Sequence, residues 1–72
     1  MAVLNDYSYD AFWSDEDGEF VGTCHEFPSL SHLAPSQPAA IEGIRRLVGD
    51  VVSDMARHGE KLPRPTPKRA YA

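Results

Sequence analysis

This chain has no second cysteine and no long apolar run, and its residues 1–44 contain no lysine or arginine. The lone Cys24 excludes an intrachain disulfide. No run of 18 apolar residues is present, so we expect no membrane span and no membrane partner. The first residues have neither the basic start nor the apolar stretch of a secretory signal, and with a single free thiol this favours a cytoplasmic protein.

The chain is short, and its 72 residues make one small domain. A domain of this size buries only about 60% of the surface that its unfolded chain exposes, so it is marginally stable alone. Small scaffolds without disulfides or metals often gain stability by self-association. We therefore expect a homo-oligomer.

Charge is distributed unevenly along the sequence. Residues 1–44 carry eight acidic and no basic side chains, whereas residues 45–72 carry seven basic and three acidic ones. Such acidity keeps a small protein soluble, and it can also attract a basic partner through complementary potentials. Direct nucleic-acid binding by the first half is disfavoured because phosphates would be repelled.

Residues 7–30 predict a β-hairpin around the acidic turn Ser14-Asp15-Glu16-Asp17-Gly18. A four-residue connection pairs Ser14 with Glu19, Trp13 with Phe20, Phe12 with Val21 and Ala11 with Gly22. Alternation along the strands then separates two faces. The drier face carries Tyr7, Tyr9, Ala11, Trp13, Phe20, Gly22 and Cys24; the other carries Ser8, Asp10, Phe12, Val21, Thr23 and His25.

A third strand and a long helix are predicted after the hairpin. Residues 26–30 end the second strand, because Pro28 cannot donate to a ladder, and residues 31–34 then form a short edge or near-edge strand. Ser36 is a favourable N-cap and Gly59 a favourable C′ residue, so a helix is expected from about Gln37 to His58. Its apolar stripe contains Ile41, Ile44, Val48, Val51 and Met55.

These elements predict an α+β fold, in which a three-stranded antiparallel sheet is covered on one face by one helix. Ala11 and Gly22 are expected to be small because the helix axis passes over them. Residues 1–62 form this domain, and residues 63–72 a Pro-rich tail in which 68–71 can add a short last strand. The predicted core is Tyr9, Ala11, Trp13, Phe20, Gly22, Cys24, Ile41, Ile44, Val48, Val51 and Met55.

Catalytic, metal and cofactor sites are not predicted. The acids of the turn are contiguous rather than alternating, and they lack the bidentate Glu of a calcium loop. Cys24 and His25 are adjacent in a strand and point to opposite faces, which disfavours zinc binding and a Cys-His catalytic pair. Nothing assembles a nucleophile, a base and an oxyanion hole, so we expect no enzyme.

The predicted interaction surface combines the acidic turn with the uncovered sheet face. Apolar side chains at adjacent positions of one face form the kind of patch that marks protein contact, although scattered apolar side chains are also ordinary on surfaces. Leu33 is a further candidate for this patch. The residues expected to contact a partner are Asp15, Glu16, Asp17, Glu19, Glu26, Phe12, Val21 and His25.

Two strings in this sequence, YSYDAFWSDEDGEFVGTCHEFPSLSHLA and GIRRLVGDVVSDM, resemble the N-terminal domain of HicB-type antitoxins over about residues 7–71. The most specific landmarks are Trp13 and the segments 17–21, 27–30 and 43–48. The resemblance implies a partial RNase H-like fold (β-β-β-α, often with a final strand) without RNase H catalysis. It also implies dimers or tetramers that neutralise a small basic HicA-type toxin, an mRNA interferase, by masking its RNA-binding and catalytic surface.

The resemblance has one departure. Family members of this style usually continue into a ribbon-helix-helix DNA-binding domain, whereas this sequence stops at Ala72, so direct DNA binding is not expected from it. Two alternatives to an antitoxin stay open at this point. One is a degenerate nuclease-like enzyme that uses carboxylates and a divalent ion, and the other is an orphan oligomeric domain with no toxin partner.

Overall fold

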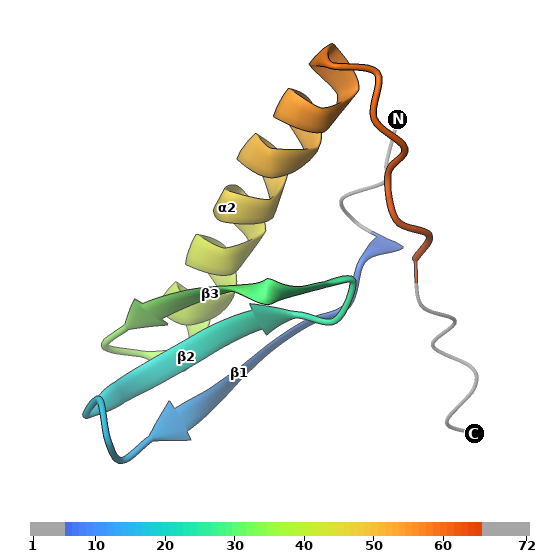
Figure 1. Ribbon diagram of the computed structural model, residues 1–72. Helices are drawn as coiled ribbons and strands as arrows, with labels where there is room; N and C mark the ends of the chain where they lie inside the picture. The colour runs from blue at the N-terminus through green and yellow to red at the C-terminus, as the bar shows by residue number, and fades with distance from the viewer. Residues whose placement is uncertain (1–5, 66–72) are drawn as a thin grey trace, which may run out of the picture.

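A three-stranded antiparallel sheet with one helix across one of its faces makes up the fold (Figure 1). The computed structural model describes residues 6–65. Its elements are β1 (Tyr9–Ser14), β2 (Glu19–Cys24), β3 (Phe27–Ala34) and α2 (Gln37–Arg57), and β2 is the central strand. The α+β arrangement predicted from the sequence is confirmed.

The β1–β2 hairpin has the predicted register. Trp13 lies opposite Phe20, and Ala11 lies opposite Gly22. Gly18 has a φ of 65°, a backbone region that glycine enters without steric cost, and its N–H donates to the Ser14 carbonyl over 2.8 Å. The turn therefore fixes the register, which in turn decides the face on which each side chain lies.

The third strand differs from the prediction, because it begins at Phe27 and contains Pro28. The prediction that residues 26–30 end the second strand is wrong. β2 already stops at Cys24, which lies opposite Phe27, and the register shifts between Thr23 and Cys24. Proline is tolerated here because β3 is an edge strand and the register shift leaves Pro28 outside the regular ladder.

α2 lies close to its predicted bounds. Ser36 Oγ accepts a hydrogen bond from the Ala39 N–H over 3.3 Å, and Gly59 has a φ of 72°. The helix ends at Arg57, one residue before the predicted end, because His58 serves as its C-cap. Capping thus explains why the helix begins and stops where it does.

The core forms where α2 crosses the sheet. Five of the predicted core residues are buried, and five others, Tyr9, Phe20, Ile41, Val51 and Met55, are partly buried. A Cβ at Gly22 would run into the Ala40 carbonyl and would lie 3.1 Å from Ile44 Cγ2. This close approach confirms the predicted reason for a small residue at position 22. The buried residues are Tyr7, just before β1, and in the sheet and helix Ala11, Gly22, Cys24, Ala34, Ala40, Ile44 and Val48.

Trp13 is not a core residue, and its predicted burial is wrong. It lies on the helix-covered side of the sheet, yet 51% of it is exposed. α2 begins only at Gln37, whose Nε2 donates to the Ala11 carbonyl over 2.8 Å, so the helix starts beside Ala11 and leaves the hairpin end uncovered. Trp13 instead contacts the Phe20 ring edge-on, with ring centroids 5.2 Å apart.

The segment after α2 returns to the start of β1 (Figure 1). Tyr7 Oη donates to the Pro63 carbonyl over 2.8 Å, which holds this segment against the domain. The short last strand proposed for residues 68–71 lies outside the described residues. Over residues 6–65, α2 is too polar to span a bilayer, and no other helix there is long enough.

The approach of α2 to β2 makes Gly22 a sensitive position. Gly22→Ala is expected to lower the free energy of unfolding by about 1–3 kcal/mol or more, because the new methyl group meets a backbone carbonyl. Gly43→Ala is the matched control. Its obstruction is the exposed His32 ring, which can rotate, and alanine favours the helix by up to about 1 kcal/mol. Urea denaturation followed by circular dichroism measures both; an equal or larger loss at Gly43 would contradict this account.

Candidate functional site

The acidic turn at the end of the β1–β2 hairpin is held in place by its own side chains. Ser14 Oγ donates to Asp17 Oδ2 over 2.9 Å and accepts the Asp17 N–H over 3.3 Å. Trp13 Nε1 donates to Asp15 Oδ1 over 2.7 Å. Asp15, Glu16 and Asp17 are all exposed. We call these three residues the acidic tip; the carboxylates of Asp15 and Asp17 are held by hydrogen bonds, and all three face solvent.

An apolar stripe crosses the sheet face that α2 leaves uncovered. Phe12 lies opposite Val21, and Val21 lies opposite Leu33 on the far strand. Phe12 is 51% exposed and Leu33 46%, while Val21 between them is partly buried. The three positions are cross-strand neighbours on one face, so they form one continuous patch. The predicted positions of Phe12 and Val21 are confirmed, as is the suggestion that Leu33 joins them.

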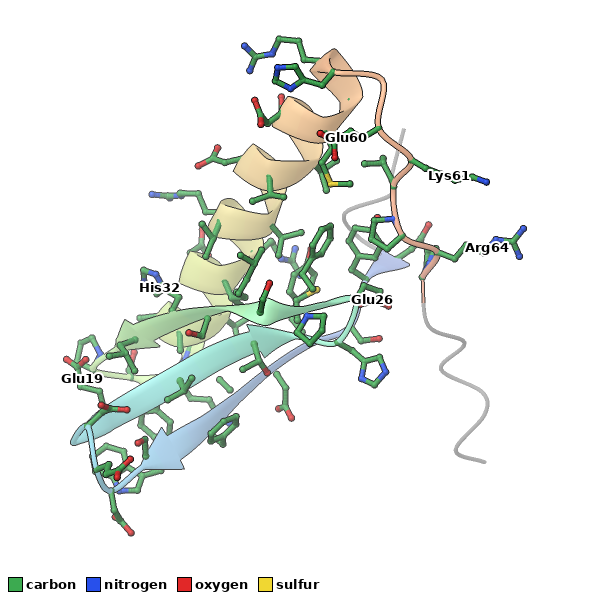
Figure 2. The ribbon with its side chains drawn as sticks, viewed as in Figure 1. Glu19, Glu26, His32, Glu60, Lys61 and Arg64 are labelled. Carbon is green, nitrogen blue, oxygen red and sulfur yellow. The ribbon has the colours of Figure 1, made fainter. Side chains whose placement is uncertain are left out.

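Two of the predicted contact residues, Glu19 and Glu26, lie at opposite ends of the sheet (Figure 2). Glu19 begins β2 next to the acidic tip. Glu26 follows β2, and its Oε1 accepts the Ser8 N–H over 2.9 Å and lies 3.5 Å from Cys24 Sγ. Glu26, expected to contact a partner together with the acidic turn, therefore lies apart from that turn. Its carboxylate instead satisfies the backbone N–H just before β1.

His25 lies on the uncovered face but away from the apolar stripe. Its N–H donates to the Ser8 carbonyl over 2.9 Å, which places it two positions beyond Val21 along that face. His25 and Ser8 line a shallow hollow together with Asp10, Thr23 and Pro28. Ser8 Oγ is buried there without a hydrogen-bond partner among the described residues.

Lys61 and Arg64, two basic residues of the described chain, lie far from the acidic tip. Lys61 and Arg64 project from the segment after α2, across the molecule from Glu19 (Figure 2). These two positive charges are therefore separated in space from the carboxylates of the tip. A basic partner that approaches the hairpin end therefore meets carboxylates without these two competing cations.

The buried end of the core holds two ionisable groups, Tyr7 and Cys24, each 1% exposed. Burial, reinforced by the nearby Glu26 carboxylate, raises the pKa of Tyr7 above its usual 10.0. Burial also raises the pKa of the Cys24 thiol above 9.0, which keeps it protonated and unreactive near neutral pH. Within residues 6–65, no three His, Cys, Asp or Glu side chains converge in a way that could hold a metal ion.

The sequence reasoning missed Trp13 as a surface residue. Trp13 directly precedes the exposed acidic turn and lies 23 residues before the helix N-cap, and this position could have indicated that it is exposed. A helix that starts beside Ala11 cannot also cover the hairpin end. Phe12 and Trp13 are successive in β1 and point to opposite faces. Exposed aromatic side chains therefore lie on both faces of the sheet beside the acidic tip.

Comparison with known proteins identifies no relative: no family model, no curated protein and no solved structure matches this chain.

The carboxylate of Glu26 is expected to stabilise the fold rather than to serve a partner. Glu26→Ala leaves the Ser8 N–H without its acceptor and should lower the free energy of unfolding by about 1–3 kcal/mol. Glu16→Ala, at the exposed tip, removes the same charge and should change it by less than about 0.5 kcal/mol. Chemical denaturation compares the two; similar losses would contradict the assigned role of Glu26.

Tyr7 makes the fold sensitive to alkali. Its pKa is raised in the folded state, so the stability that it contributes is complete below pH 10 and is lost as the pH rises through the folded-state pKa. Tyr7→Phe loses the hydrogen bond to Pro63 and should be less stable than the natural chain at pH 7. Because Phe cannot ionise, this difference should shrink above pH 10 in thermal melts recorded across pH. A constant difference would show that ionisation of Tyr7 is not coupled to folding.

Proposed function

We propose that this chain is a protein-binding module of the HicB antitoxin kind, which neutralises a small basic HicA-type toxin in the cytoplasm by masking its RNA-binding and catalytic surface. One observation carries the proposal: the sheet has an uncovered face with a continuous apolar stripe, and that face ends at the exposed acidic tip. The stripe supplies contact area, and the tip supplies charge complementary to a basic protein.

The two parts of this surface have different physical roles. Exposed carboxylates at the acidic tip attract a basic surface over several ångströms and mainly raise the association rate. Phe12 is a large aromatic side chain that is already half exposed, and burial of such anchors usually slows dissociation. Because Asp15 and Asp17 are held by hydrogen bonds, they lose little conformational entropy when a partner binds.

The order of elements also supports the proposal. Three antiparallel strands followed by one covering helix is the order that the partial RNase H-like fold of these antitoxins would have. The acidic residues of the described chain are spread over β1, the tip, the two ends of β2, α2 and the segments before β1 and after α2, a distribution that suits surface charge better than catalysis.

Co-expression with the HicA-type toxin encoded next to this chain's gene tests the proposal. Growth should be restored, and the two proteins should co-purify as a complex. Absence of such a toxin gene, or of both rescue and complex with the toxin present, would contradict an antitoxin role.

Variants of the surface separate its two parts. Neutralising the tip (Asp15→Asn, Glu16→Gln and Asp17→Asn together) should slow toxin association about tenfold at low salt, with less effect at high salt. Phe12→Ala should mainly speed dissociation, by roughly tenfold or more. Asp54→Asn on α2 is the control for lost charge away from this surface and should change neither rate. Surface plasmon resonance at two salt concentrations measures these effects.

A further inference from the structure

The two edges of the sheet, β1 and β3, present different backbone groups to solvent. The hydrogen bond from the His25 N–H to the Ser8 carbonyl marks these residues as a bonded pair. Bonded pairs alternate along an antiparallel ladder, so Asp10 and Phe12 direct their backbone groups toward β2. Ala11 between them directs its N–H and C=O outward, away from the sheet.

The outward groups of Ala11 are already satisfied within the chain. Its N–H donates to Asp10 Oδ1 over 2.8 Å, and its carbonyl accepts from Gln37 Nε2 over 2.8 Å. The middle of the β1 edge is therefore closed to an added strand. Side chains that occupy edge groups in this way are one means by which proteins avoid unwanted strand pairing.

The β3 edge is open. On the other side of β2, the same alternation makes Phe20–Ala34 and Gly22–His32 the bonded pairs. Ser31 and Leu33 therefore direct their N–H and C=O groups outward. Both residues are exposed, and within residues 6–65 these outward groups have no hydrogen-bond partner.

We propose that β3 pairs antiparallel with β3 of a second copy of this chain, which joins two sheets into one of six strands. Charge favours a second copy over a foreign strand. β3 contains no Asp, Glu, Lys or Arg, so it offers nothing to attract a basic partner and nothing to repel its own copy. β1, the other edge strand, carries Asp10, which would repel the same residue of a second copy. The pairing is isologous and closes with two-fold symmetry, as most homodimers do.

The apolar stripe becomes continuous across this pairing. Leu33 is its last member and lies on the edge strand, so a two-fold axis that passes at Leu33 brings the Leu33 side chains of both copies together. On the opposite face the two α2 helices come to the same side of the joined sheet. There the hollow between β3 and α2 faces the other copy; it is lined by the charged residues Glu42, Arg46 and Asp50 as well as by His32, Ala39, Gly43 and Leu47.

Self-pairing through β3 leaves the acidic tip and Phe12 toward the two outer ends of the joined sheet. The same stripe then serves two purposes, with Leu33 for the second copy and Phe12 for the toxin. This division of surfaces rests on the proposed function, whereas the pairing itself does not.

The matched variants Leu33→Lys and Phe12→Lys test the pairing. Both replace a half-exposed apolar residue on the same sheet face, one on the β3 edge and one on the β1 edge. The natural chain should be a dimer by analytical ultracentrifugation. Leu33→Lys should raise the dimer dissociation constant at least about tenfold, because like charges meet across the axis. Phe12→Lys should leave dimerisation within about threefold and weaken only toxin binding.

Amide hydrogen exchange gives a second readout that does not depend on a variant's folding. The Ser31 and Leu33 amides should become protected as the concentration of the natural chain rises, whereas those of His32 and Ala34 should be protected at every concentration. A monomer at several hundred micromolar, unprotected Ser31 and Leu33 amides, or equal loss of the dimer in both lysine variants would overturn the pairing. A dimer that binds no toxin would overturn only the proposed function.

Discussion

The Ala40 carbonyl of α2 lies directly against Gly22 of β2, and this contact determines where the helix lies on the sheet. Small side chains collect around it: Ala11, Ala34 and Ala40 form one buried cluster. Further along the helix, Ile44 and Val48 pack with Tyr7 and Cys24 in a second cluster. The gradient from small to large side chains matches the way α2 approaches the sheet at one end and moves away from it toward the other (Figure 1).

A single helix cannot cover a three-stranded sheet on both faces, and the consequences of this shortage shape the surface. One face keeps its apolar stripe exposed, and even on the covered face Trp13 remains outside the core. Because these side chains stay exposed, less apolar surface is buried on folding, and a chain of this length buries little surface to begin with. Proteins that bind others through such patches recover that burial in the complex. The exposed aromatic residues and the small size of the chain are thus linked, because its single helix covers only part of the sheet.

Much of the fold follows from short-range rules that are visible in the sequence. The five-residue turn with its terminal Gly18 determines the hairpin register, and Ser36 and Gly59 bound the helix. Alternation then correctly places Phe12 and Val21 on the uncovered face. Each of these features depends on residues that are neighbours in the chain.

The errors arise where the outcome depends on tertiary position. Pro28 signals the end of a strand in a central position, but β3 is an edge strand and tolerates it. Trp13 lies in sequence alternation with the core residues, but α2 starts beside Ala11 and does not reach far enough to cover Trp13. Glu26 is one of several acids in the sequence, yet only the turn after Cys24 brings its carboxylate to the Ser8 N–H. The alternation of residues along a strand predicts the sheet face on which a side chain lies. The side chains that it contacts depend on where each strand and helix ends.

The hydrogen bond between Tyr7 and the Pro63 carbonyl has a consequence for how this molecule can be handled. It brings the chain just before β1 beside the chain that leaves α2, and β1 runs from there toward the acidic tip. The entry and exit of the described chain therefore share one pole of the domain, and the tip occupies the other. A tether joined through either pole-side segment would hold the protein on a solid support with the carboxylates and Phe12 directed toward the solution.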